Sequence, residues 1–171
     1  ITGASSTGKS TTLASMVNHI NLNKTCHILT LENPIEYLYR DKSAIINQRE
    51  VGVDTESFQR SLKHIIRQDP DVIVIGEMRD AETVETAISA SQTGHLVFSS
   101  FHAEDARRAV TRLLEFFPLS SRDQIRMQLA LNLRAIICQR LLKRTGGTTG
   151  LVPAVEILVN TPMAEKLIAS D

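Results

Sequence analysis

Apolar residues recur along this chain at two spacings, one typical of amphipathic helices and one of buried strands. Leu13, Met16, Val17 and Ile20 lie three or four positions apart, so they predict a helix near the start of the chain. Buried strands are predicted at 26–31 and 95–100, and a β-branched run bounded by Pro70 and Gly76 predicts a central strand at 71–76. A further short strand is expected at 44–51. The same reasoning predicts helices with apolar stripes at 58–66, 84–91, 106–114 and 125–141, then a strand at 151–159 and a helix from 161.

Small polar residues and glycines predict where two of these helices begin or end. Asp54 and Thr55 are expected to cap the second helix, because their side chains can accept from free backbone N–H groups. Ser120 or Ser121 is expected to open one long helix. Its apolar stripe continues to the stretch 143–147, where two basic residues and then two glycines are expected to end it.

The order of the elements predicts the fold class. Strands that alternate with helices are typical of an α/β fold, with a mostly parallel sheet flanked by helices. Pro153 cannot donate to a neighbouring strand, so the strand at 151–159 is expected at an edge. Ile1-Thr2 resembles the tail of a strand, and we therefore expect residues 1–171 to be one domain of a longer protein whose first strand is incomplete here.

Composition narrows the function classes. With 42% hydrophobic residues in 171, the chain can bury a core, and 19 basic residues balance 19 acidic ones. This neutral charge argues against a strongly basic surface for nucleic acid or membrane lipids. Cys26 and Cys138 form no Cys-x-x-Cys motif, so a disulfide framework or structural zinc site is not expected. No apolar run is long enough to predict a transmembrane segment.

The first eight residues after Thr2 match G-x-x-x-x-G-K-[ST] at every fixed position. In such a loop glycines let successive N–H groups point inward, and the following helix presents its positive end to phosphates. Lys9 is expected to neutralise the β- and γ-phosphates, and Ser10 to offer a hydroxyl to Mg²⁺. The sequence therefore predicts a bound nucleotide, contacted by Gly3, Ala4, Ser5, Ser6, Thr7, Gly8, Lys9, Ser10 and Thr11.

Acidic residues and histidines follow or flank the predicted strands. Glu77 directly follows the predicted strand at 71–76. There it can hold Mg²⁺ or orient the attacking water, or it is a solvated acid without a function. Glu36 lies in the stretch 32–36, which has either a general base or only a turn with two acids. His95 and His102 flank the strand at 95–100 and are either nucleotide contacts or ordinary structural histidines.

Taken together, these motifs resemble the secretion ATPase superfamily. Their order and spacing match its Walker A, Asp box, Walker B and His box segments, at 3–10, 32–36, 76–80 and 93–102. The string at 47–52, Asn-Gln-Arg-Glu-Val-Gly, and the segment 116–118 are similar to those of type IV pilus retraction ATPases, the motors of twitching motility. Two lone cysteines also favour this branch over the extension and type II secretion branch, where a tetracysteine module is expected.

This resemblance implies a RecA-like P-loop ATPase domain with ATP and Mg²⁺ as cofactors. It implies Glu36 as general base, Glu77 and Ser10 at Mg²⁺, Lys9 as a catalytic cation, and His95 and His102 in nucleotide binding. It further implies a homohexamer, a missing N-terminal PAS-like domain, and a pilus platform protein as partner. The expected location is the cytoplasm, peripheral at the inner face of the bacterial inner membrane.

The chain also departs from the family pattern. Asn33 stands where the family usually has aspartate, and the C-terminal helix differs from the segment linked to retraction. In the family, arginines from the N-terminal domain reach the neighbouring nucleotide; here Arg49 or Arg79 is a substitute if it faces the site. Two alternatives stay open: a pilus-extension or secretion ATPase of the same superfamily, and a non-hydrolysing assembly subunit that only binds nucleotide.

Overall fold

The chain forms two compact units. One consists of residues 10–100, and the other combines residues 1–9 with residues 101–171. The structure is a computed structural model and describes residues 1–145 and 150–170, with the side chains of Gln59, Leu62 and Lys63 left out. Among these described residues, no helix is long and apolar enough to cross a membrane.

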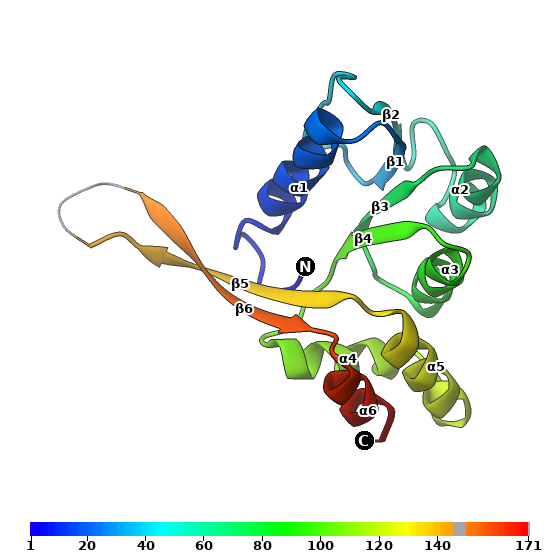
Figure 1. The fold of residues 1–171 in the computed structure, drawn as a ribbon, viewed down its shortest axis with the longest axis vertical. Helices are drawn as coiled ribbons and strands as arrows, with labels where there is room; N and C mark the ends of the chain where they lie inside the picture. Colours follow the sequence, from blue (N-terminus) through cyan, green and yellow to red (C-terminus); the bar gives the residue numbers. More distant parts are fainter. Residues whose placement is uncertain (146–149, 171) are drawn as a thin grey trace. The chain divides into compact units, whose positions relative to one another are not determined.

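Residues 10–100 form an α/β unit around a parallel sheet (Figure 1). Its four strands lie in the order β2-β1-β3-β4, and all of their pairings are parallel. The strands are β1 (His27–Glu32), β2 (Ile45–Glu50), β3 (Val72–Glu77) and β4 (Leu96–Ser100). The predicted α/β class and the four predicted strands are confirmed, with ends that shift by one residue.

Helices cover both faces of this sheet, which explains why its central strands are continuously apolar. Helix α1 (Lys9–Asn23) lies against one face, and α2 (Phe58–Ile65) and α3 (Ala81–Gln92) cover the other (Figure 1). The short helix η1 (Ile66–Gln68) continues from α2. The core on the second face consists of Leu29, Leu31, Ile65, Ile73, Ile75, Ala87 and Ala90. All of these side chains are at most 4% exposed.

Side-chain caps mark several of the helix starts. Asp80 accepts from the N–H of Thr83 at the start of α3. At α2, the side chain of Ser57 accepts from the N–H of Arg60 at 3.2 Å, so the predicted capping by Asp54 and Thr55 is wrong. Asp54 instead accepts from the N–H of Glu50 at 2.8 Å, because the turn after β2 folds it back toward that strand.

The second unit is built on a two-stranded antiparallel ribbon, β5 (Ala135–Lys143) with β6 (Leu151–Val159). Thr2 forms bridges to Phe101 and to Cys138 of β5, so residues 1–2 act as a short strand between them. Helices α4 (Ala106–Glu115), α5 (Leu119–Asn132) and α6 (Pro162–Ser170) complete the unit. A small core gathers Ala103, Ala106, Ala109 and Ile136. Strand β6 pairs only with β5 among the described residues, as Pro153 predicted.

The predicted long helix from Ser120 or Ser121 to residue 144 is wrong. Helix α5 ends at Asn132, and β5 begins at Ala135. The amide of Asn160, which follows β6, donates to Ala130 O and Leu133 O at 2.7 and 2.9 Å, so a distant residue satisfies the last carbonyls of α5. The glycine pair 146–147, predicted to follow the helix, and the side chain of Leu62 lie outside the described residues.

Candidate functional site

Residues 3–8 form a tight loop directly before α1, which begins at Lys9. Gly3 has a φ of +143° and Gly8 a φ of +86°, which other residues rarely adopt. A Cβ on Gly3 would lie 2.4 Å from the carbonyl oxygen of Gln139, and a Cβ on Gly8 would lie 2.8 Å from its Nε2. The positive φ therefore favours glycine at both positions, and at Gly3 the backbone of β5 also leaves no room for a Cβ.

The ammonium group of Lys9 is held against this loop. Lys9 Nζ donates to the carbonyl oxygens of Gly3 and Ala4 at 2.9 and 2.7 Å, and the side chain is buried. The hydroxyl of Thr7 donates to the same Ala4 oxygen at 2.9 Å. The loop thus curls around a fixed cation at the start of a helix, an arrangement that suits a phosphate chain.

Gln139 on β5 supports the loop and was not predicted as a functional residue. Its Nε2 donates to Thr7 O at 2.7 Å, its backbone N–H donates to Thr2 O at 2.9 Å, and it is 2% exposed. The expected helix over 125–141 concealed this role. The one sequence feature that could have pointed to this role was a single amide side chain within the mostly apolar stretch 135–142.

Within the unit of residues 10–100, Glu32 and Glu77 lie at the same edge of the sheet. They end β1 and β3, which pair directly, with Leu31 opposite Ile75. A Cβ on Gly76 would lie 3.4 Å from Glu32 Cα, so the two strand ends approach closely there. Arg79 Nε donates to Glu77 Oε2 at 2.7 Å, and the Glu77 side chain is 21% exposed. This edge follows the carboxyl ends of parallel strands, where α/β proteins bind ligands.

Glu36 is exposed and follows β1 in a segment without helix or strand, residues 33–42. Asn33 at the start of this segment is also exposed. The hydroxyl of Tyr37, next to Glu36, lies 2.8 Å from the hydroxyl of Thr11 in the first turns of α1. The structure therefore brings the segment that carries Glu36 to the helix that begins at the phosphate loop.

His95 lies at the other edge of the sheet. Its Nδ1 is 2.9 Å from Ala90 O and 3.0 Å from the hydroxyl of Thr93, so its ring satisfies the carboxyl end of α3. The five residues of β4 separate it from the edge with Glu77, roughly 16 Å of extended chain. The structure does not bring His95 together with the acidic residues, and its part in nucleotide binding stays a prediction.

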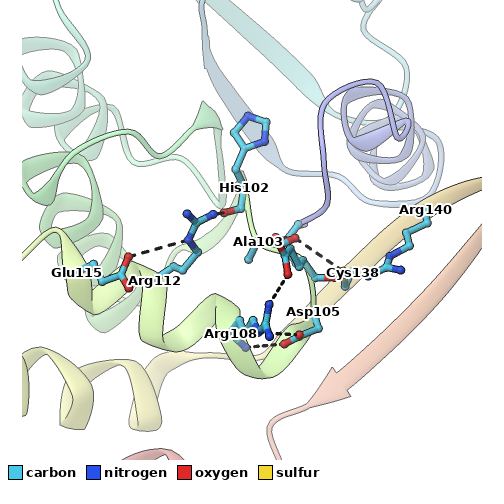
Figure 2. Close-up of polar contacts among 10 residues, drawn as sticks. His102, Ala103, Asp105, Arg108, Arg112, Glu115, Cys138 and Arg140 are labelled. Atoms are coloured by element: carbon cyan, nitrogen blue, oxygen red, sulfur yellow. Dashed lines mark hydrogen bonds and ion pairs between the residues drawn. The ribbon is translucent and has the colours of Figure 1, made fainter.

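His102 follows the carboxyl end of β4 by two residues. Arg112 Nη1 donates to His102 O at 3.3 Å, while the imidazole ring points away from α4 (Figure 2). The backbone two residues further on is also fixed, because Arg140 Nη2 and the thiol of Cys138 both donate to Glu104 O at 3.2 Å. His102 thus has a fixed backbone and a ring directed away from the groups that fix it.

Two arginines were expected to substitute for those of an absent domain if they face the site. Arg79 pairs with Glu77 and is 63% exposed. Arg49 Nη2 donates instead to Gln68 Oε1 at 3.2 Å, which attaches it to η1. Of these two arginines, therefore, only Arg79 contacts a candidate site residue among the residues that the structure describes.

Neither cysteine has the features of a reactive thiol. Burial raises the pKa of Cys26, with Asp71 adding to the effect. Burial likewise raises the pKa of Cys138, where Glu156 is the next contribution. Among the described residues, no group of three or more His, Cys, Asp or Glu could hold a metal ion.

Comparisons with known proteins identify the family of this chain. A family described as "Type II/IV secretion system protein" matches residues 1–157. From Pseudomonas aeruginosa, the type IV pilus ATPase PilU is 46% identical over 97% of the chain and 43% of its own length, and the retraction ATPase PilT is 43% identical over 100% and 49%. A crystal structure of the pilus retraction motor PilT with bound ADP superimposes with a TM-score of 0.93 at 49% identity, covering 98% of this chain and 48% of that one.

The chain spans about half the length of the relatives that it matches. Over that half, it shares sequence with PilU and PilT and the fold of PilT. It belongs to the type II/IV secretion system protein family, and within it is similar to the type IV pilus motors PilT and PilU.

Proposed function

We propose that this chain is the ATPase domain of a motor that retracts type IV pili and so powers twitching motility. The names of its relatives support the assignment, since both PilU and PilT are described as type IV pilus ATPases. The observation that carries the proposal is the Lys9 loop: an ammonium held by two carbonyl oxygens, inside a turn that favours glycine at two positions. Such a loop at the start of a helix is typical of phosphate-binding sites.

In this proposal the nucleotide is ATP, bound along Gly3–Thr11. The backbone N–H groups of the loop bind the phosphates, and Lys9 neutralises the charge that develops on the γ-phosphate. The ring of His102 is directed away from α4 and is proposed to sense the phosphates or their water.

The donor set fits Mg²⁺. The Ser10 hydroxyl and the Glu77 carboxylate are hard oxygen ligands, and Mg²⁺ typically takes only one or two such groups beside phosphate oxygens and water. Bound there, the ion would neutralise charge on the β- and γ-phosphates. Glu77 is oriented by Arg79, whose guanidinium donates to it at 2.7 Å.

Glu36 is proposed as the general base that accepts a proton from the attacking water. Its carboxylate is exposed, next to the residue whose hydroxyl meets Thr11 on the phosphate-loop helix. The proton then resides on Glu36 until the products leave. Glu32, whose Oε1 already accepts from the hydroxyl of Thr30 at 2.7 Å, is less available for this role.

We further propose that the whole protein works as a homohexamer, in the cytoplasm at the inner face of the inner membrane, against a pilus platform protein. The chain spans about half of its relatives, and the remaining part would supply the arginines that complete the neighbouring site. Work would come from rotation between protomers as ATP is hydrolysed and ADP and phosphate are released.

The test is phosphate release by the full-length protein with Mg-ATP. Glu36→Gln keeps the shape of the side chain and removes its basicity, so binding of a fluorescent ATP analogue should persist while turnover falls by roughly 10²–10⁴-fold. Glu85→Gln, at an exposed glutamate on α3, is the matched control and should leave both unchanged.

A loss of less than tenfold in Glu36→Gln would move the base to another carboxylate, with Glu77 and Glu32 next. ATP binding without phosphate release by the unaltered protein would favour a non-hydrolysing assembly subunit. Retraction and extension differ in cells: loss of a retraction motor should leave pili in place without twitching, whereas loss of an extension motor should leave no pili.

A further inference from the structure

Segment 33–42 carries Glu36, yet its backbone is held almost entirely by side chains. Residues 35–41 form neither helix nor strand. At one end, Ile35 N–H donates to Glu50 Oε2 at 2.9 Å. At the other, Asn21 Nδ2 donates to Arg40 O at 2.9 Å and Asn21 Oδ1 accepts from Lys42 N–H at 3.1 Å. A backbone that lacks a neighbouring strand must find such partners elsewhere.

Gln48 on β2 holds the middle of the segment. Its Nε2 donates to Tyr37 O at 2.8 Å, and its Oε1 accepts from Tyr39 N–H at 2.9 Å. One carboxamide therefore satisfies a carbonyl and an N–H two residues apart, as the backbone of an adjacent strand would. The same Nε2 lies 3.3 Å from Glu32 Oε1, which ties the amide to the carboxyl end of β1.

These contacts bracket Glu36 on both sides. Its preceding residue, Ile35, is held by Glu50, and its following residue, Tyr37, is held by Gln48. Both partners come from β2, from the string at 47–52 that the phosphate chemistry does not use. The exposed Glu36 side chain is thus mounted on a backbone whose position depends on two polar residues of a neighbouring strand.

We propose that Gln48 is a positioning residue for hydrolysis: it holds the backbone of segment 33–42 so that the Glu36 carboxylate is presented in one geometry. The proposal rests on the proposed role of Glu36. Gln48 does no chemistry itself, so its loss should lower turnover and leave nucleotide binding by the phosphate loop intact. A displacement near 1 Å is enough to cost roughly 10²-fold in rate.

The experiment measures steady-state phosphate release and ATP-analogue affinity for the full-length protein. Gln48→Ala and the nearly isosteric Gln48→Met should each lower kcat by roughly tenfold to a hundredfold, with little change in affinity. Asn47→Ala is the matched control, since Asn47 is the adjacent, exposed amide on β2 and makes none of these contacts. Thermal unfolding of each variant separates lost positioning from lost folding.

A double-mutant cycle identifies the residue through which Gln48 acts. If Gln48 works through Glu36, then Gln48→Ala should change the residual rate of Glu36→Gln by no more than about twofold. Equal fold-losses in both backgrounds would overturn the proposal, as would an unchanged kcat in Gln48→Ala.

Amide hydrogen exchange gives a readout that needs no turnover. Gln48→Ala should increase exchange at the Tyr39 N–H, while Asn47→Ala should not. If the unaltered protein hydrolyses no ATP, the proposed function fails and with it the role in hydrolysis, but the exchange data still judge whether Gln48 holds the segment. Unchanged exchange would overturn that contact as well.

Discussion

The phosphate loop and segment 33–42 both present chemistry from irregular backbone, but they are held in different ways. The loop at residues 3–8 is fixed by its own residues and by a close approach to β5, with Lys9 bonded to carbonyls five and six residues earlier. Segment 33–42 is fixed by side chains that are distant in sequence, from α1 and β2. The first region therefore combines local glycine geometry with one tertiary support from β5, whereas the second depends almost entirely on tertiary hydrogen bonds.

This difference predicts how each region fails. A loop that depends on glycine conformation and one cation should lose nucleotide binding when either is changed. A segment that depends on borrowed hydrogen bonds should keep nucleotide binding and lose turnover, because the catalytic carboxylate moves while the phosphates stay bound.

The largest effect is expected for Lys9→Ala. The variant should lose both ATP-analogue affinity and phosphate release, since Lys9 supplies the positive charge within the loop. Fluorescence titration and phosphate release measure the two losses. Lys24→Ala, at an exposed lysine just after α1, should behave like the unaltered protein. Wild-type affinity in Lys9→Ala would contradict the assignment of the loop to phosphate.

Gly3→Ala should come next, since it combines strain with a clash. The new Cβ would lie 2.4 Å from Gln139 O at a φ of +143°. Gly52→Ala is the control for strain alone: it has a φ of +92° with nothing within 4 Å of its Cβ, and should cost about 1–2 kcal/mol of unfolding free energy. Chemical denaturation and ATP-analogue binding should show the larger loss for Gly3→Ala. Equal losses would mean that the close approach to β5 has no energetic consequence.

Gln139→Ala sharpens the comparison with Gln48. Removing Nε2 leaves Thr7 O without its buried donor, which should cost about 1–3 kcal/mol and loosen the phosphate loop. We expect KM for Mg-ATP to rise while kcat at saturation is largely kept, the reverse of Gln48→Ala. Gln124→Ala, at an exposed glutamine on α5, serves as control. A pure kcat effect in Gln139→Ala would erase the distinction between the two regions.

The smallest effect concerns Tyr39 in segment 33–42. Burial, with smaller contributions from Glu32 and Tyr37, raises the pKa of Tyr39 from 10 to about 12. A raised pKa means that the folded protein holds this proton longer, so its contribution to stability is complete below pH 10 and is lost by about pH 12. Tyr39→Phe should remove the phenolate absorbance that appears near pH 12. It should also flatten the fall in unfolding free energy between pH 10 and about pH 12. If Tyr39→Phe left the absorbance titration of the protein unchanged near pH 12, Tyr39 would not be the buried tyrosine with the raised pKa.

Much of this molecule could be predicted from local patterns. The phosphate-loop motif, the apolar run of β3 and the stripes of α1 and α3 predicted the α/β fold and the order of its elements along the chain. Each of these patterns is decided by neighbours within a few residues. The motif positions at Glu77, Glu36 and Lys9 were also visible, because a strand end or a glycine turn marks each one. The family resemblance is likewise confirmed by the match over residues 1–157.

Other features were decided only by the tertiary structure. Leu133, Ile136, Ile137 and Leu141 fit a helical spacing, but pairing of β5 with β6 and the bonds from Asn160 make residues 135–143 a strand. The same pairing puts Gln139 under the phosphate loop, and β2 supplies the amide that holds segment 33–42. Apolar spacing over a short run serves a helix or a strand equally well, so long-range hydrogen bonds make the choice. The sequence by itself determined the chemistry available, and the contacts between distant segments decided which backbone presents it.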